Sequence, residues 1–227
     1  MVVSANSSDT TSAHDALSRL CQTYWYPLYS YVRRRGHSAD DSQDLTQEFF
    51  ARLLQRRWIS NADQEKGRFR SFLLAAMNHF LADEWDKARA QKRGGGISTI
   101  PLQFDTAETR FGNEPADNLT PERSFERKWA LTLLELVLTQ LRTEYQADGR
   151  GELFAHLTPC LVGERMAQPY AALAKRLGCS EGTIKAAVHR LRQRYRQLLR
   201  DEIAQTVTAP EEVDEELHHL FVVLGGR

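Results

Sequence analysis

Apolar side chains recur at helical spacing along most of this chain of 227 residues, and the run from Phe69 to Trp85 is one example. No segment alternates apolar and polar residues over the length of a strand, which is the pattern of a half-buried β-strand. The sequence therefore predicts an all-α fold. Residues 94–119 lack sustained periodicity and are rich in glycine, proline, asparagine and threonine, which indicates a linker. We expect two helical domains joined by a flexible linker.

Composition and periodicity divide the chain into five parts. Small polar residues predict a disordered tail at 1–13. Helical periodicity predicts domains at 14–93 and 122–204, with the linker at 94–121 between them. Residues 205–227 form a C-terminal extension in which acids precede an apolar run.

The C-terminal extension predicts an acidic amphipathic helix, because its acids cluster at 211–216 and apolar side chains recur at helical spacing. Three roles are open for this helix. It could fold back in the free protein and compete with DNA for a basic surface, it could complete a hydrophobic core, or it could have no docking role. The apolar residues at helical spacing are Val213, Leu217, Leu220, Phe221 and Leu224.

Residues 170–194 have the order of features that a helix-turn-helix requires: a short helix, a tight turn and a second helix for the major groove. Ala174 is small where the two helices approach, and Gly178 can adopt the left-handed conformation of the turn. Ser180 is a suitable N-cap for the second helix, whose positive end favours Glu181. We expect the C-terminal domain to be a helix-turn-helix. The candidate DNA-binding residues are Ser180, Glu181, Thr183, Lys185, Ala186, His189 and Arg190.

Charge is segregated along a chain whose formal net charge is zero. Between 175 and 200 eight basic residues stand against one acid, Glu181, whereas 201–227 contains seven acids and one arginine, Arg227. The alternative to DNA binding is an ordinary amphipathic helix pair whose arginines form a solvated face. A small residue, a glycine, an N-cap and a basic face all occur where a helix-turn-helix requires them, and this combination favours DNA binding. Four side chains of the second helix are expected to face inward: Ile184, Ala187, Val188 and Leu191.

The segment SEGTIKAAVHRLR at 180–192 resembles region four of the extracytoplasmic-function (ECF) sigma factors of bacteria. The segment SADDSQDLTQEFF at 38–50 resembles region two of the same family, in which this helix binds the coiled-coil clamp of the polymerase β′ subunit. A polar helix face agrees with a protein contact, whereas the alternative is that the acids only compensate the helix dipole. The resemblance implies that core polymerase is contacted by Asp40, Asp41, Asp44, Gln47 and Glu48.

Residues 67–83 resemble the family segment that opens and reads the −10 promoter element. Asp83 follows Asn78 by five residues, whereas the acid of the family pattern usually follows by four. The aromatic side chains of this segment are expected in the core, and nearby basic side chains are candidates for phosphate contacts. The resemblance also implies a pocket for flipped bases in the loop at 58–67. The candidate −10 contacts are Arg68, Arg70, Asn78, Lys87 and Arg89.

The resemblance implies an alternative sigma factor that binds core RNA polymerase through the β′ clamp helices and the β flap. Such a protein directs promoter-specific initiation of transcription, with the N-terminal domain on the −10 region and the C-terminal domain on the −35 region. An anti-sigma factor or another regulator is a candidate further partner. One alternative is a stand-alone helix-turn-helix regulator, which would need the region-two likeness to be accidental. Another is a helical interaction protein, which predicts no salt-dependent affinity for DNA.

Several classes of protein are disfavoured by the sequence. It contains no P-loop, G-x-S-x-G or H-E-x-x-H motif, so we expect no enzymatic activity and no cofactor. The three cysteines, Cys21, Cys160 and Cys179, are widely spaced, which disfavours a disulfide framework or a structural metal site. The sequence has no signal-peptide pattern and no apolar stretch of the roughly 20 residues that span a membrane. We therefore expect a cytoplasmic protein.

Overall fold

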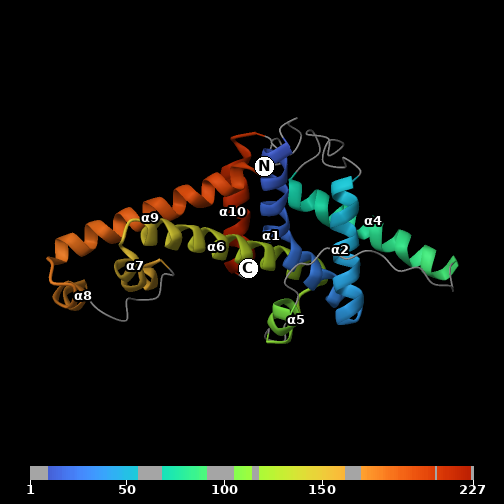
Figure 1. The fold of residues 1–227 in the computed structure, drawn as a ribbon, viewed down its shortest axis with the longest axis horizontal. Helices are drawn as coiled ribbons and strands as arrows, with labels where there is room; N and C mark the ends of the chain where they lie inside the picture. The colour runs from blue at the N-terminus through green and yellow to red at the C-terminus, as the bar shows by residue number, and fades with distance from the viewer. Residues whose placement is uncertain are drawn as a thin grey trace. The chain divides into compact units, whose positions relative to one another are not determined.

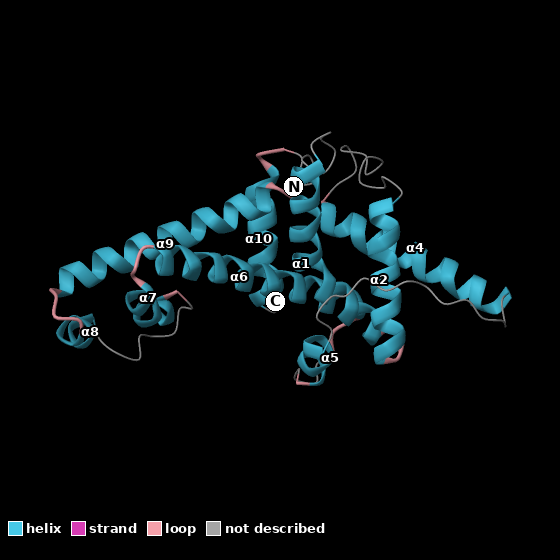
Figure 2. Ribbon diagram, in the orientation of Figure 1, coloured by secondary structure: helices cyan, strands magenta, loops and turns pink. Residues whose placement is uncertain are grey.

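The computed structural model describes residues 10–55, 68–90, 105–113, 118–161, 170–207 and 209–225. Over these ranges the chain forms nine α-helices and one short 3-10 helix, and it contains no strand (Figure 2). The predicted all-α class is therefore confirmed. Within the same ranges, none of the helices is long and apolar enough to cross a membrane.

Figure 1 labels the helices, which follow one another along the chain in numerical order. Their bounds are α1 Thr10–Arg34, α2 Ala39–Gln55, α4 Phe69–Ala90, α5 Asp105–Gly112, α6 Pro121–Ala147, α7 Gly151–Leu157, the 3-10 helix η2 Thr158–Cys160, α8 Tyr170–Arg176, α9 Glu181–Ala204 and α10 Glu212–Gly225.

The chain forms two compact units whose boundaries fall inside helices. The first unit comprises Met1–Thr132 together with Ile203–Arg227, and the second comprises Leu133–Glu202. Both α6 and α9 therefore begin in one unit and end in the other. The sequence prediction instead placed the boundary in the linker before residue 122 and treated 205–227 as a separate extension. Helical periodicity cannot reveal this division, because a helix can bury one end in one core and the other end in another.

The core of the first unit forms where α1, α2 and α4 pack together. The ring of Tyr24 on α1 meets Phe69 edge-on, with 5.5 Å between the ring centroids. Phe49 on α2 meets Phe80 on α4 in the same way at 5.7 Å. These ring contacts explain why the aromatic stripe of residues 69–80 faces inward, as the sequence predicts.

The inward stripe of α4 ends earlier than the sequence predicts. Trp85 was expected to continue it, but this side chain is 62% exposed. Its neighbours Asp83, Asp86 and Lys87 are exposed as well. The spacing of apolar residues fixes the face of a helix but not the length over which a partner covers it, so this prediction was wrong for Trp85.

Two predicted unstructured segments contain helical residues. Helix α1 begins at Thr10, inside the expected tail at 1–13, and residues 1–9 lie outside the described ranges. Helix α5 lies inside the predicted linker 94–121, where Ala107 packs with Tyr26 and Tyr29 of α1. The helix has too few apolar residues to show a periodic pattern, so the sequence alone did not reveal it.

A bidentate ion pair attaches α5 to α1. The Arg33 guanidinium donates to both carboxylate oxygens of Glu108, at 3.1 and 2.8 Å, and the Tyr29 hydroxyl donates to the same carboxylate. The hydrogen bonds from Arg33 hold the pKa of Glu108 below its usual value. Arg110 lies over the Tyr26 ring at 4.1 Å from its centroid. Part of the predicted flexible linker is thus bound to the first unit.

Local signals set the ends of α6. The backbone N–H of Arg123 donates to Oγ1 of Thr120, which makes Thr120 the N-cap before Pro121. At the other end Gly149 has a φ of 69°, and the N–H of Arg150 donates to the carbonyl of Tyr145 at 2.8 Å. This is the Schellman arrangement, in which a left-handed residue ends a helix. Both ends of α6 are therefore set by local hydrogen bonds and by one left-handed glycine.

Candidate nucleic-acid and polymerase interfaces

The turn between α8 and α9 has the geometry that the sequence predicts. Gly178 has a φ of 64°, and the N–H of Cys179 donates to the carbonyl of Ala174 at 3.0 Å. Ser180 then caps α9, because its Oγ accepts the N–H of Thr183 at 3.1 Å. A left-handed glycine that ends one helix, followed at once by the N-cap of the next, produces a tight turn.

The inward face of α9 in the second unit is the predicted one. Ile184, Ala187, Val188 and Leu191 are all buried, with Leu191 fully inaccessible to solvent. Leu173 and Ala174 on α8 are buried too. Because burial of these positions fixes the rotation of α9, the opposite side chains must face outward.

Every predicted −35 contact is exposed in the second unit. Lys185 and Glu181 form an i,i+4 ion pair at 2.8 Å, and this hydrogen bond raises the pKa of Lys185. The hydroxyls of Ser180 and Thr183 lie 2.8 Å apart. Solvent exposure and a capped, positive helix end are what a helix needs to meet base edges and phosphates. The exposed residues are Ser180, Glu181, Thr183, Lys185, Ala186, His189 and Arg190.

A groove of about 510 Å³ lies along one face of α9, bordered at one end by Tyr170 at the start of α8. Its α9 residues recur every three or four positions, which is the spacing of a single helix face. Arg192 is held in place there, because its guanidinium donates to the carbonyl of Cys160 at 2.7 and 3.1 Å. The sequence prediction did not include most of this face, although the charge segregation at 175–200 pointed to it. The basic and histidine side chains that line the groove are Lys185, His189, Arg192, Arg196 and Arg200.

The acidic start of α2 carries the predicted polymerase contacts in the first unit. Ser38 caps this helix by accepting the N–H of Asp41 at 3.1 Å, and its hydroxyl donates to the Asp41 carboxylate at 2.7 Å. Asp40, Asp41 and Asp44 are exposed. Glu48 is half-buried and pairs with Arg52 at 2.5 Å. The open acidic surface is therefore formed by the aspartates more than by Glu48.

Gln47 lies apart from this open surface, because its side chain is buried with 8% exposure. Its Nε2 has no hydrogen-bond partner among the described residues. A buried side chain cannot contact a rigidly docked partner directly, so any contribution of Gln47 to polymerase binding acts through the packing of α2.

The start of α4 places two predicted −10 contacts in different environments. Arg68 is half-buried, with 32% of its side chain exposed, whereas Arg70 is 4% exposed. Arg70 donates to Glu216 at 2.5 Å and to Glu126 at 2.7 Å, and it lies over the Trp129 ring. Arg70 was a candidate for a phosphate contact, but carboxylates from α6 and α10 enclose it.

The remaining −10 candidates lie further along α4. The amide oxygen of Asn78 accepts hydrogen bonds from the Tyr31 hydroxyl at 2.5 Å and from Arg35 at 2.7 Å. Lys87 is exposed and pairs with Glu84 at 2.9 Å. The side chain of Arg89 and the predicted base pocket at 58–67 lie outside the part of the chain that is described in detail.

Metal binding has no support within the described residues, where no group of three or more His, Cys, Asp or Glu side chains could hold an ion. The cysteines Cys21, Cys160 and Cys179 are free thiols. Burial raises the pKa of the Cys21 thiol to about 11, so this thiol is protonated at neutral pH and is a poor nucleophile.

Comparison with protein families identifies one domain. Residues 20–91 match the family model of sigma-70 region 2, a span that covers the described part of α2 and α4 and most of α1. A sigma-70 region 2 domain is therefore present. It supports a sigma-factor family and indicates a role in RNA polymerase binding and promoter melting. No curated protein and no solved structure matches the chain.

Proposed function

We propose that this protein is an alternative sigma factor of the ECF group, which recruits core RNA polymerase to promoters through two DNA-binding helices. The observation that carries the proposal is the combination of a sigma-70 region 2 domain at 20–91 with a capped, outward-basic α9 in the second unit. A region 2 domain alone accounts for polymerase binding and strand opening. A second DNA-binding helix adds the −35 contact that makes recognition promoter-specific.

In this proposal α9 reads the −35 element. Its exposed residues lie on two adjacent stripes of the helix: Thr183, Ala186 and Arg190 on one, and Lys185 and His189 on the other. Arginine can donate two hydrogen bonds to a guanine edge, and lysine can approach a guanine or a phosphate. The groove beyond His189 then follows the phosphate backbone with Arg196 and Arg200. The β flap of the polymerase is the proposed partner of this unit.

The aspartate surface of α2 is the proposed contact with the β′ clamp helices. Asp40, Asp41 and Asp44 present three carboxylates to solvent on one end of the helix. Charge complementarity of this kind mainly sets the association rate and the choice of partner. Dipole compensation explains Asp40 and Asp41 in the first turn of α2, but it does not require Asp44.

Opening of the −10 element is assigned to α4 and the loop before it. Arg68 and Lys87 supply phosphate contacts, and base capture in the loop at 58–67 would offset the loss of stacking. No covalent step is involved. An anti-sigma factor or another regulator is a proposed further partner, which would act by covering one of these surfaces.

Run-off transcription with purified core polymerase tests the proposal. The protein should associate with core polymerase, and the holoenzyme should start transcription at defined sites on promoters recovered by their binding to it. Core polymerase alone is the control. A stand-alone regulator would behave differently: it would bind its DNA tightly without polymerase and would not associate with core. That result would overturn the proposal.

A further inference from the structure

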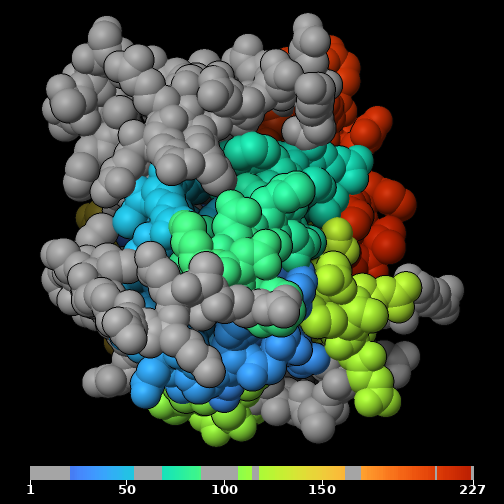
Figure 3. All heavy atoms as spheres, turned by 90° about the vertical axis from the view of Figure 1, so that its right-hand side faces the viewer, coloured from blue at the N-terminus to red at the C-terminus, as the bar shows by residue number. Residues whose placement is uncertain are grey.

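Helix α10 belongs to the first unit and packs next to the start of α4. Val213 and Leu220 are buried, with Leu220 fully inaccessible, and Glu216 is 2% exposed between them. In Figure 3 the first turns of α4, in teal, border the red C-terminal residues. The helix therefore contributes both apolar and acidic side chains to this contact.

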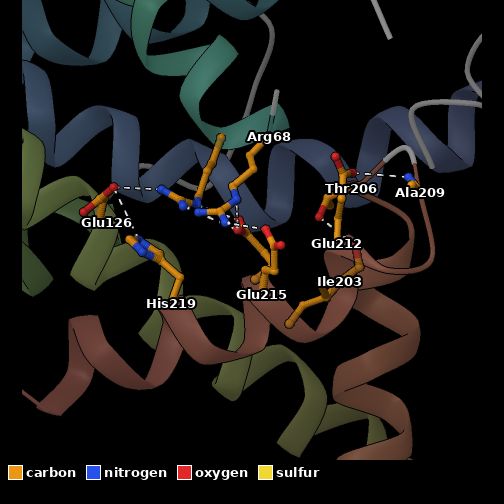
Figure 4. A network of polar contacts seen from close by, with 10 residues as sticks. Arg68, Glu126, Ile203, Thr206, Ala209, Glu212, Glu215 and His219 are labelled. Atoms are coloured by element: carbon orange, nitrogen blue, oxygen red, sulfur yellow. Dashed lines mark hydrogen bonds and ion pairs between the residues drawn. The ribbon is translucent and has the colours of Figure 1, made fainter. Parts of the chain in front are cut away.

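The acidic side chains of α10 engage the two arginines that begin α4 (Figure 4). Nε of Arg68 lies 3.0 Å from Glu216, and Nη2 of Arg68 lies 3.2 Å from Glu215. Glu216 also accepts Nε of Arg70 at 2.5 Å. Both arginines thus direct guanidinium N–H groups at carboxylates of α10, in the same way that they would direct them at phosphate oxygens.

At the outer edge of this contact, another anion can replace the carboxylate that pairs with Arg68. Glu215 is 70% exposed and its partner Arg68 is 32% exposed, so water and salt screen their attraction. Only Val213 and Leu220 are fully buried apolar anchors, whereas Phe221 and Val222 are 61% and 44% exposed. A buried ion pair such as Arg70 with Glu216 is itself a weak source of stability, because desolvation offsets its attraction. The helix therefore has few fully buried anchors.

We propose that α10 is an intramolecular competitor of promoter DNA, whose carboxylates occupy the arginines at the start of α4 until a nucleic-acid phosphate replaces them. The inference rests on the proposed function, which assigns the start of α4 to the −10 strand. Exchange swaps one anion for another and requires no covalent step. In the free protein Arg68 is neutralised by α10, and in the promoter complex it is neutralised by DNA.

Single charge-neutralising variants of the full-length protein test the inference. Glu215→Gln removes the exposed partner of Arg68, and Glu216→Gln removes the buried carboxylate without changing its size. The matched control is Glu211→Gln, which removes the same charge from an exposed position just before α10. The probe is a fluorescently labelled single-stranded oligothymidine, and its affinity is measured by anisotropy at salt concentrations from about 50 to about 200 mM.

If α10 competes with DNA, affinity for the oligonucleotide should increase when a carboxylate that contacts an arginine is removed, and not when Glu211 is neutralised. Glu215→Gln should bind the oligonucleotide about two- to fivefold more tightly than the wild type at low salt, because an exposed ion pair of ordinary strength no longer holds α10 in place. Its plot of log K against log salt should be steeper by about 0.7, the value for one additional phosphate contact on a single strand. The gain should disappear in an Arg68→Ala background.

Four results would overturn the inference. Equal gains from Glu211→Gln and Glu215→Gln would mean that only overall charge matters. No gain from either α10 variant, or no oligonucleotide binding at all, would mean that the arginines do not form a DNA site when α10 is weakened. Lower thermal stability of Glu216→Gln together with unchanged DNA affinity in Glu215→Gln would assign α10 a purely structural role.

Core polymerase binding by the same proteins separates this inference from the proposed function. If the wild type and Glu211→Gln do not bind core polymerase, the proposed function fails. If core binding is intact and oligonucleotide affinity does not change as described, only the competition fails.

Discussion

Arg190 illustrates how a single exposed side chain tests the DNA interface. It is exposed on α9 one helical turn beyond Ala186 and Ala187. We expect Arg190→Ala to weaken promoter binding by about 1–3 kcal/mol if Arg190 reads a base, with relaxed sequence preference at one position. Binding of the holoenzyme to mutated −35 sequences measures this.

Arg142→Ala is the matched control for Arg190, because Arg142 is an exposed arginine on α6 in the same unit. It should leave promoter affinity unchanged. If Arg190→Ala and Arg142→Ala behave alike, the assignment of α9 as the reading helix is incorrect.

Asp44 is the clearest single probe of the polymerase interface. It is exposed, whereas Glu48 is engaged by Arg52, so a charge reversal at Glu48 would also disturb a contact within the fold. We expect Asp44→Lys to lower core polymerase affinity by roughly tenfold or more, since it reverses the charge of one of the three exposed carboxylates proposed to make the contact. Thermal unfolding should stay unchanged. Native assembly of Asp44→Lys, with Glu152→Lys as the exposed control, would contradict the assignment.

The turn between α8 and α9 gives a prediction at the scale of the element. A Cβ at Gly178 would meet nothing within 4 Å, but the φ of 64° is costly for any residue with a side chain. Gly178→Ala should therefore lower the free energy of unfolding by about 1–2 kcal/mol. Gly182, inside the first turn of α9, provides the opposite case: its Cβ would lie 3.7 Å from the Ser180 Oγ, an ordinary contact.

The two glycine variants are therefore expected to change the free energy of unfolding differently. Gly182→Ala should be neutral or stabilising by about 0.5–1 kcal/mol, because alanine favours a helix over glycine. Chemical denaturation of both variants measures the difference. Equal destabilisation by the two substitutions would show that the cost at Gly178 is not a backbone effect.

Docking of α10 should depend on pH through His219. Burial and the charge of Arg70 lower the pKa of His219 from its ordinary value of 6.5, and Arg68 acts in the same direction while Glu126 and Glu216 oppose it. The unfolded chain therefore binds a proton near pH 6.5 when the folded protein does not. Stability should fall as the pH drops below this value and should be unaffected by His219 above it.

Thermal unfolding at about pH 7.5 and about pH 5.5 checks the His219 prediction. The wild type should lose more stability between the two values than His219→Gln does. His218→Gln, an exposed neighbour on α10, should behave like the wild type. An identical loss in the wild type and His219→Gln would exclude the contribution.

At the scale of the whole molecule, zero net charge hides a strongly basic segment. The groove along α9 collects Arg192, Arg196 and Arg200 from that segment. We expect promoter binding to weaken with salt, with a slope of about −0.9 in log K against log salt for each phosphate contact. Arg196→Ala should reduce the slope by about 0.9 and leave sequence preference intact, as measured by filter binding. Loss of sequence preference instead would mean that Arg196 contacts a base.

The sequence by itself determined the features whose causes lie within a few residues. Helical periodicity predicted the all-α class because a helix shows its buried face every three or four positions. Gly178 and Ser180 were identified as turn and cap residues because a positive φ is a property of one residue and capping is a local hydrogen bond. The inward and outward faces of α9 followed for the same reason. The −35 candidates are therefore exposed where the pattern put them, although their contact with DNA stays a prediction.

Only the tertiary structure decided which polar side chains are open to a partner. Arg70 is buried because Glu216 lies against it, although the two residues are 146 positions apart along the chain. Gln47 is buried because neighbouring helices cover its position on α2. Trp85 is exposed because the neighbouring helices end before its position on α4. Helix α5 depends on Arg33 and Tyr26 of α1 more than on its own short apolar pattern. A sequence pattern gives the direction in which a side chain points, whereas its burial and its charge partner depend on elements that meet only after the chain has folded.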